Sequence, residues 1–335
     1  MPTMNLTGWI ERDGVRLSPA DVERMLSEAP EALARCGGEF LLTYGDYIAR
    51  DALGIMPGPV PPGTICCDGR EVARIAPDPP SCTLEEAIVT AVGLRSDEGA
   101  VAFSGGVDSA LVAHLARLPC VVVGLEGSHD VRRAAAAARM MELDLEIVTP
   151  TEDDVAEALA RVVRVIPDPT NPLEASIATT LSFVAAWAEE RGHTRILAGQ
   201  GADELFGGYA RYLTSPDLAA ELERDFADLA RQRTRDQAVA GLHGAYFSMP
   251  YLDIRVVRAA RAIPAEEKVR GGVRKHPLRE VAERHIPAEI ARAEKKAMQY
   301  GSGIWRAMQR LARDNGYKKS VQGYLTDISR AEHDY

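Results

Sequence analysis

The sequence lacks the features that define several large classes of protein. Its five cysteines are an odd number and none has CxxC spacing, so neither a disulfide framework nor a zinc site is indicated. The N-terminus has no apolar signal-peptide core, and no stretch approaches the roughly 20 apolar residues of a membrane-spanning helix. These absences lead us to expect a cytoplasmic protein that does not enter the membrane.

Positive charge is also scarce. The chain has 39 Lys and Arg against 49 Asp and Glu, which gives a formal net charge of −10. This balance does not favour binding to nucleic acid or to membranes. A local basic run nevertheless includes Arg270, Arg274, Lys275, Arg279, Lys295 and Lys296. Taken alone, such a run is typical of a solvated surface.

The material that is present is typical of a globular protein of two domains. Hydrophobic residues make up 46% and charged residues 26% of the 335 positions. Residues 1–82 are rich in glycine, proline and short apolar runs, which predicts a small β-rich domain. A proline-rich linker leads to Thr83, which has Glu86 three residues on and predicts a helix N-terminus. We therefore expect domains at residues 1–82 and 83–335.

The second of these domains shows strands that alternate with helices. Strands are predicted at 100–103, 120–125, 145–149 and 195–198, and helices at 84–94, 109–117, 130–141, 155–165 and 177–190. This alternation predicts an α/β fold with a parallel sheet. Beyond about residue 215 we find only helical patterns, and the polar tail from residue 314 is expected to be partly mobile.

The most informative segment is AVAFSGGVDSALVA at residues 100–113. A buried strand runs into a turn of small residues, and the turn opens a helix whose N-terminal N–H groups favour an anion. Asp108 would repel a phosphate there unless a cation lies between them, which indicates Mg²⁺. The segment is neither a Walker loop nor a GxGxxG dinucleotide loop. A plain strand-to-helix turn is the alternative.

A second segment, GQGADELFGGY at residues 199–209, also follows an apolar strand. Parallel sheets bind ligands at the carboxyl ends of their strands. Asp108 and Asp203 could therefore share one Mg²⁺ ion on a pyrophosphate group. The alternative for Asp203 is an acidic residue in the first turn of a helix.

Together these segments resemble a known family. SGGVDS is similar to the PP-loop of the ATP-pyrophosphatase superfamily. VGLEGSHD at 123–130, GQGADELFGGY, MPYLD at 249–253, KHPLR at 275–279 and the stretch from Arg292 and Lys295 to GSG at 301–303 resemble, in order, the synthetase domain of glutamine-dependent asparagine synthetase, class B. This resemblance implies a PP-loop α/β domain with a helical C-terminal part, ATP and Mg²⁺ as cofactors, and adenylation of a carboxylate.

The resemblance also implies roles for individual residues. The residues implied to hold the pyrophosphate are Ser104, Gly105, Gly106, Asp108 and Ser109, and the Mg²⁺ ligands are Asp108 and Asp203. The residues implied to line the nucleoside pocket are Phe103, Val123, Gly124, Ala198 and Gly199. Lys295 would stabilise the adenylation transition state, with Lys275 or Arg279 also facing the anionic site. The basic run is then no longer explained as a solvated surface.

Gln200 departs from the family pattern. The resemblance places an acidic residue there in asparagine synthetases and an aromatic residue in relatives that close β-lactam rings. An acid can take a proton from the incoming ammonia, whereas glutamine cannot. The sequence therefore leaves open which amine attacks, although Gln200 remains a candidate residue of the catalytic centre.

The N-terminal segment resembles part of the glutaminase domain of the same enzymes, through GEF at 38–40, RDALGI at 50–55 and PG at 62–63. Those enzymes use a cysteine after the initiator methionine, whereas the second residue here is Pro2. We therefore expect a shortened, inactive glutaminase-like domain. Cys36 could be an internal nucleophile, but a buried structural thiol is the favoured interpretation.

The leading hypothesis is an AMP-forming amide ligase that uses aspartate and ammonia by default, with a possible ammonia-supplying partner and a homodimer suggested by the family. One alternative is a ligase for a larger substrate, such as a modified nucleoside, a peptide or an antibiotic precursor. Another alternative is a nucleotide-binding regulator without catalytic activity.

Overall fold

The structure is a computed structural model that describes residues 3–293, 301–318 and 320–330. The chain forms two compact units. Unit 1 comprises Met1–Asp97, Gln200–Ala230 and Ser248–Lys275, and unit 2 comprises Glu98–Gly199, Arg231–Phe247 and His276–Tyr335. Both units are thus built from segments far apart in sequence. Over the described residues, no helix has the length and hydrophobicity needed to span a membrane.

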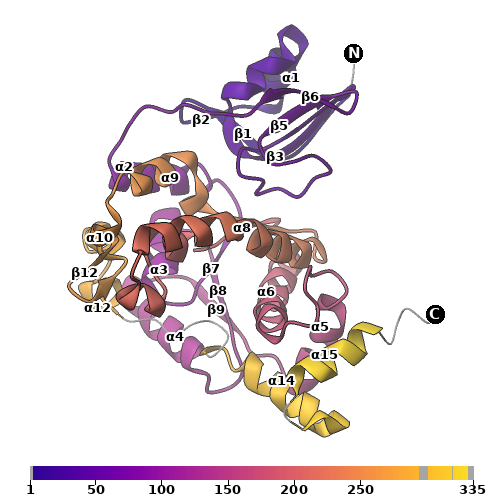
Figure 1. Cartoon of the computed structure of the whole chain (residues 1–335), viewed down its shortest axis with the longest axis vertical. Coiled ribbons are helices and arrows are strands. Elements are labelled where there is room, and N and C mark those ends of the chain that lie inside the picture. Colours follow the sequence, from indigo (N-terminus) through magenta and orange to yellow (C-terminus); the bar gives the residue numbers. More distant parts are fainter. Residues whose placement is uncertain (1–2, 294–300, 319, 331–335) are drawn as a thin grey trace. The chain divides into compact units, whose positions relative to one another are not determined.

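The N-terminal part of unit 1 is an antiparallel sheet in the order β2-β1-β3-β4-β5-β6 (Figure 1). Its strands are β1 Met4–Arg12, β2 Val15–Arg16, β3 Gly37–Tyr44, β4 Tyr47–Arg50, β5 Thr64–Cys67 and β6 Arg70–Arg74. Helix α1 (Pro19–Glu28) covers one face and packs Val22 and Leu26 into the core with Phe40 and Leu42 of β3. The small β-rich N-terminal domain expected from the sequence is therefore present.

Helix α1 was not expected from the sequence, because the glycine and proline content of residues 1–82 favoured strands and turns throughout. The local signal for a helix is nevertheless present. Ser18 is the N-cap and accepts a hydrogen bond from the N–H of Asp21, and Pro19 occupies the first turn. The average composition of residues 1–82 outweighed this local signal for the start of a helix.

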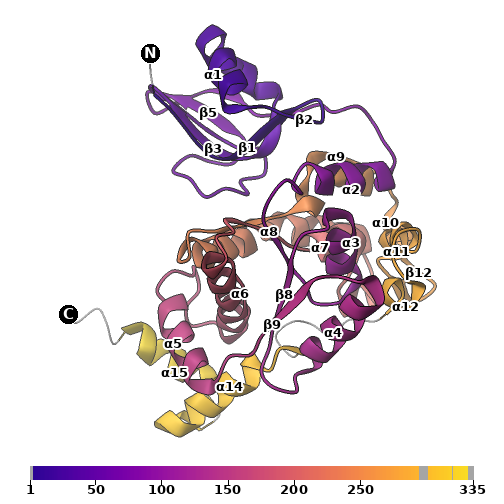
Figure 2. The ribbon, with the colours of Figure 1, turned by 180° about the vertical axis from the view of Figure 1, so that it is seen from behind.

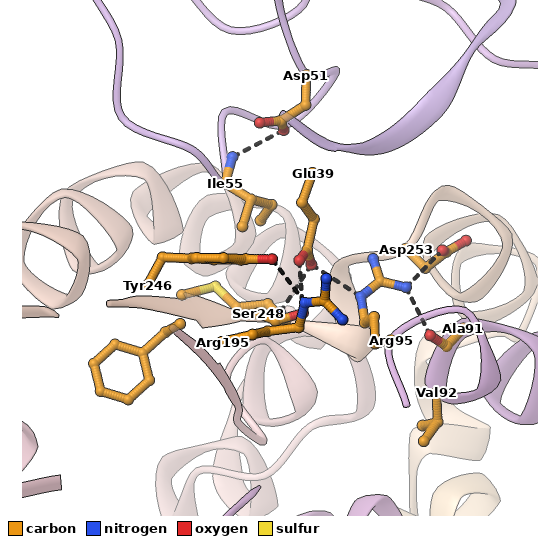
Figure 3. Close-up of polar contacts among 12 residues, drawn as sticks. Glu39, Asp51, Ile55, Ala91, Val92, Arg95, Arg195, Tyr246, Ser248 and Asp253 are labelled. Carbon is orange, nitrogen blue, oxygen red and sulfur yellow. Dashed lines mark hydrogen bonds and ion pairs between the residues drawn. The ribbon is translucent and has the colours of Figure 1, made fainter. Parts of the chain in front are cut away.

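A buried carboxylate organises the loop after β4. Asp51 is almost fully buried and accepts hydrogen bonds from the N–H groups of Ile55 (2.8 Å) and Met56 (2.9 Å), the first of which is drawn in Figure 3. Arg50 donates to the carbonyls of Met56 (2.6 Å) and Val60 (3.1 Å). Arg50 and Asp51, the two charged residues of the RDALGI segment, therefore fix the backbone of the loop that follows β4. Burial raises the pKa of Asp51 to about 6.

This raised pKa predicts a pH dependence of stability. The folded chain binds the Asp51 proton more tightly than the unfolded chain, so the contribution is fully present below the unfolded pKa and is lost as pH rises to the folded one. Between about pH 4 and about pH 6 the free energy of unfolding should fall by up to about 3 kcal/mol, at 1.36 kcal/mol per unit. Urea unfolding at several pH values in this range should show that the free energy of unfolding falls with pH in wild type. This fall should be lost in Asp51→Asn. An identical slope in both proteins would contradict the assignment.

The remainder of unit 1 is mainly helical. Its elements are α2 Leu84–Gly93, α7 Ala202–Phe206, η2 Ala210–Thr214, η3 Pro250–Leu252, α9 Ile254–Arg261, α10 Ala265–Lys268, β12 Val269–Arg270 and β13 Val273–Arg274. Helix α2 begins with the predicted capping box, in which Thr83 and Glu86 bond each other's backbone N–H groups. Helix α8 (Leu218–Gly241) runs from unit 1 into unit 2.

Unit 2 is built on a sheet in the order β11-β10-β7-β8-β9, in which β10, β7, β8 and β9 are parallel neighbours. Its strands are β7 Ala100–Ala102, β8 Cys120–Val123, β9 Leu145–Val148, β10 Arg195–Leu197 and β11 Tyr246–Ser248. Both views place α4 (His129–Met141) and α6 (Pro172–Glu190) on opposite sides of β8 and β9 (Figures 1 and 2). The predicted α/β fold with a parallel sheet is confirmed.

The other elements of unit 2 are α3 Val107–Ala116, α5 Glu152–Val162, α11 His276–Ala282, α12 Ala288–Ala291, α14 Ile304–Ala312, the π-helical turn η4 Arg313–Tyr317 and α15 Val321–Arg330. One expectation for the C-terminal part was wrong. Strand β11 and the β12–β13 hairpin lie in the region where we expected only helices. These strands have two or three residues each, which is too short to show a period-2 pattern in sequence.

Candidate functional site

The loop between β7 and α3 in unit 2 is fixed by close packing. Gly105 has φ +67°, and a side chain there would place its Cβ 2.9 Å from the Cα of Ala134 on α4. Both the left-handed backbone and this close approach require glycine. The next residue, Gly106, is the N-cap of α3 and has no side chain to cap the helix. The first N–H groups of α3 are therefore left to other acceptors, as an anion site requires.

Two hydroxyl groups close the loop. Ser109 Oγ accepts a hydrogen bond from the backbone N–H of Ser104 (3.1 Å), lies 3.2 Å from Ser104 Oγ and donates to the carbonyl of Gly106 (3.2 Å). Asp108 is buried in the first turn of α3. The sequence-predicted residues Ser104, Gly106, Asp108 and Ser109 are thus brought together on one loop.

The loop after β10 packs directly on this first loop. A Cβ on Gly199 would lie 3.0 Å from the Cβ of Asp108 and 3.5 Å from the N of Ser109. Strands β10 and β7 are parallel neighbours, so their carboxyl ends lie at the same edge of the sheet. The start of the second predicted loop therefore lies against the first, and the backbone contact at Gly199 explains why a glycine is needed there.

Sequence reasoning missed Arg133. This residue extends from α4 and donates from Nε (3.1 Å) and Nη2 (2.8 Å) to the carbonyl of Ser104. Burial lowers the pKa of its guanidinium, while the carboxylates of Asp130 and Asp108 oppose that shift. Arg133 lies in an alanine-rich helix, so no motif pointed to it. Its guanidinium holds the backbone of the loop between β7 and α3 and brings a positive charge beside it.

The predicted nucleoside residues also converge within unit 2. Phe103, Val123 and Ala198 are buried and directly follow or end the neighbouring strands β7, β8 and β10. Gly124 lies where a Cβ would be 2.5 Å from Ser128 Oγ and 3.1 Å from the carbonyl of Ser302. Sheet topology therefore places this set at the carboxyl edge of neighbouring strands.

Asp203 and Lys275 form an ion pair within unit 1. Lys275 Nζ lies 2.6 Å from Asp203 Oδ1, and the Lys275 side chain is buried. The backbone of Gly208 lies below the pair, where a Cβ would be 1.8 Å from Asp203 Oδ1 and 2.3 Å from Lys275 Cε. Arg274 donates to the carbonyl of Gly208 (2.7 Å). Lys275 therefore contacts the predicted metal ligand Asp203 directly. Only glycine fits at position 208, beside this ion pair.

The other three predicted catalytic residues have different surroundings. Gln200 precedes Gly201, the N-cap of α7, and is half-buried. Arg279 of α11 is buried and donates to the carbonyls of Ala291 and Ala293, the latter at 3.2 Å. This guanidinium thus holds the backbone that leads into residues 294–300. Lys295 lies in that segment and is outside the described residues.

Cys36 is fully buried at the start of β3, and burial raises the pKa of its thiol to about 11. A thiol with such a pKa contains almost no thiolate at neutral pH. The Sγ atom of Cys36 packs against the side chain of Met25, 3.9 Å from its Sδ atom. The structure therefore favours the structural interpretation of Cys36 over the nucleophilic one.

The parallel sheet with its SGGVDS loop defines a PP-loop α/β protein of the ATP-pyrophosphatase type. The asparagine synthase profile matches residues 83–246 and 214–327, and the chain belongs to the asparagine synthase family. The match begins at the residue that opens the expected second domain. The resemblance drawn from the motifs is confirmed.

Two relatives are informative. The chain is 32% identical over 278 residues to a putative glutamine-hydrolysing asparagine synthetase 1 of Methanocaldococcus jannaschii, covering 70% of this chain and 51% of that protein. It is 30% identical over 258 residues to the carboxyethyl-arginine β-lactam-synthase of Streptomyces clavuligerus, covering 74% and 48%. The chain thus spans about half the length of these relatives.

Proposed function

We propose that this chain is an ATP- and Mg²⁺-dependent carbon–nitrogen ligase that activates a carboxylate as its adenylate and transfers the acyl group to an amine. The observation that carries the proposal is the phosphate loop of unit 2. Its glycines, hydroxyls and Asp108 meet Gly199 at the carboxyl edge of the parallel sheet. Membership of the asparagine synthase family supports the same chemistry.

In the first half-reaction a substrate carboxylate oxygen attacks the α-phosphorus of ATP, and the bond to the β-phosphate oxygen breaks to release pyrophosphate. Ser104, Ser109 and the N–H groups that open α3 would bind the departing pyrophosphate. The Arg133 charge supports the same anion from the α4 side. Lys295 would stabilise the charge that develops on the α-phosphate.

The residues fit a magnesium ion. Asp108 is a buried carboxylate in a loop that otherwise favours anions, which is the donor type that Mg²⁺ prefers beside phosphate. The family resemblance assigns Asp203 of unit 1 to the same ion, and within that unit its carboxylate is paired with Lys275. When bound, the ion would neutralise charge on the pyrophosphate oxygens.

In the second half-reaction the amine nitrogen attacks the acyl carbon, AMP leaves with the electrons of the acyl–oxygen bond, and the nitrogen loses a proton. Gln200 cannot accept that proton, so a different group must take it. Aspartate with ammonia is the default substrate pair, from the family. Cytoplasmic location, a homodimer and an ammonia-supplying partner are expectations from the sequence that accompany this proposal.

Pyrophosphate exchange into ATP tests the first half-reaction directly. Purified protein with ATP, Mg²⁺ and labelled pyrophosphate should exchange label only when a suitable carboxylate is present, starting with aspartate. Mass spectrometry of the products formed from a metabolite pool would identify the adenylate. If ATP binds but no acid supports exchange, the proposal fails and a nucleotide-binding regulator is the better interpretation.

Replacement of Arg133 should weaken ATP binding. Arg133→Gln removes the charged hydrogen bonds to the Ser104 carbonyl, and such bonds contribute about 1.5–3 kcal/mol, so the Kd for Mg·ATP should rise by at least about tenfold. Arg132→Gln is the matched control, because Arg132 is the adjacent residue on α4 and its side chain is exposed. Calorimetric titration would measure both. Equal affinities in the two variants would show that Arg133 does not position the loop.

A ligase for a larger substrate is the second candidate. It is favoured by Gln200, and by similarity to the β-lactam synthase at an identity close to that of the asparagine synthetase relative. Intramolecular amide formation would remove the need for ammonia, because the amine would belong to the substrate. Exchange supported by an amino-substituted acid, and not by aspartate, would distinguish this candidate from the first.

A further inference from the structure

A chain of buried charges in unit 1 has no part in the proposed chemistry. Glu39 of β3 is fully buried and pairs with Arg95 (Oε1 to Nε, 2.9 Å). Arg95 pairs with Asp253 (Nη1 to Oδ2, 3.0 Å), and Asp253 with Arg255 (3.1 Å). Arg255 continues to Glu11 of β1 (2.9 Å). Figure 3 shows the Glu39–Arg95–Asp253 part of this chain, in which strands of the N-terminal sheet hold residues some 200 positions later.

Glu39 has a second set of partners. Its Oε2 accepts a hydrogen bond from the hydroxyl of Ser248 (2.6 Å), and its Oε1 accepts one from the backbone N–H of Met249 (3.0 Å). One carboxylate therefore binds both Arg95 and the start of the segment that ends at Asp253. A buried charge is costly unless its hydrogen bonds are satisfied, and Ser248 and Met249 supply two of those that Glu39 accepts. Glu39 and Arg95 thus fix the backbone of residues 248–253.

The same segment packs on the second loop, residues 199–209. Leu252 fills the space beside Gly201, where a Cβ would lie 2.5 Å from Leu252 Cδ2. The rings of Tyr251 and Phe206 meet edge to face, with centroids 6.2 Å apart. Both rings are fully buried. Two side chains of the fixed segment therefore contact both ends of α7, the short helix that carries Asp203.

We infer that Glu39 is a positioning residue, through which the N-terminal sheet holds the second loop and its Asp203 in place. The order of contacts runs from Glu39 to residues 248–249, then through Tyr251 and Leu252 to α7. The N-terminal sheet therefore has a role in the synthetase part of the chain that is separate from any glutaminase chemistry. Only the consequence for Mg²⁺ depends on the proposed function.

Amide hydrogen exchange tests this inference without any assay of activity. The reporters are the N–H groups of Leu205 and Gly208, which bond the carbonyls of Gly201 (3.0 Å) and Asp203 (2.8 Å). In Glu39→Gln, which keeps the side-chain shape and removes the charge, exchange at these amides should accelerate by roughly fivefold or more. Ser248→Ala removes only one bond to Glu39 and should produce a smaller acceleration in the same peptides.

Asp51→Asn is the matched control. Asp51 is an equally buried carboxylate directly after β4, and it accepts its hydrogen bonds from Ile55 and Met56. This variant should lower the melting temperature and leave exchange at Leu205 and Gly208 unchanged. The inference is overturned if Glu39→Gln leaves the loop amides unchanged, or if Asp51→Asn accelerates them equally. If Glu39→Gln does not fold, Ser248→Ala against Asp51→Asn gives the same decision.

The consequence for catalysis is a separate measurement. If Asp203 binds Mg²⁺, Ser248→Ala should raise the half-saturating Mg²⁺ concentration in pyrophosphate exchange several-fold, with a smaller change in the KM for the acid. A change in kcat alone would overturn positioning of the metal ligand. If no acid supports exchange at all, the proposed ligase fails, while the exchange rates of the loop amides still decide the role of Glu39.

Discussion

Asp108→Asn is expected to reduce carboxylate-dependent pyrophosphate exchange by at least about 100-fold, because removing one electrostatic contact to the developing charge typically costs that much. Asp108 is buried at the first turn of α3, against Gly199. Asparagine has nearly the same volume, so the loop packing should persist. Initial exchange rates over a range of Mg²⁺ concentrations would measure the effect.

The matched control for Asp108→Asn is Asp154→Asn. Asp154 lies in the first turn of α5, the helix that follows β9 of the same sheet, and completes a capping box with Thr151. Its replacement should lower stability only slightly and leave exchange within about twofold of wild type. If Asp108→Asn retains comparable exchange, Asp108 is only an acidic residue of a helix N-terminus and not a metal ligand.

Arg95→Met should lower the free energy of unfolding by about 3–5 kcal/mol, because it leaves the buried carboxylate of Glu39 without its cation and leaves Asp253 with Arg255 alone. The Arg95 side chain is 2% exposed and contacts Glu39, Asp253 and the carbonyl of Ala91 (2.7 Å). Its guanidinium also lies 4.9 Å from the Trp9 ring. Typical total stabilities are about 5–15 kcal/mol, so this single change should shift the urea midpoint markedly.

Arg258→Met provides the comparison for Arg95→Met. Arg258 pairs with Asp78 at 2.6 Å, but both side chains are exposed, so its loss should cost at most about 1 kcal/mol. The two variants remove the same charge and differ in burial. If Arg95→Met is no more destabilising than Arg258→Met, the buried charge chain contributes nothing that a surface pair does not.

Local signals in the sequence predicted the turns and helix starts around the candidate site. The SGGVDS segment predicted a turn of small residues between a strand and a helix, and Gly105 in that turn has a left-handed backbone. The capping pair Thr83–Glu86 predicted the start of α2. Those features depend on residues within a few positions of one another, and their physics is that of helix termini and tight turns.

Features that depend on distant residues could not be predicted. Arg133 lies in a helix whose sequence reads as alanine-rich packing, and only the placement of α4 brings its guanidinium to Ser104, 29 positions earlier. Arg279 belongs to a motif that suggested an anion contact, whereas it bonds the carbonyls of Ala291 and Ala293. In both cases a long side chain can reach many positions, and the packing of the helices decides which backbone groups it contacts.

The sequence by itself determined the chemistry that this protein can attempt. The small residues and carboxylates of residues 104–109 and 199–209 predict a site for phosphate and metal, and the parallel sheet follows from βα alternation. Only the tertiary structure decided what holds the second loop in place. Glu39 meets Ser248 across 209 positions. A buried carboxylate requires a hydrogen-bond donor or a cation as its partner, but the sequence does not show which residue that partner is. The packing of the sheet decides it.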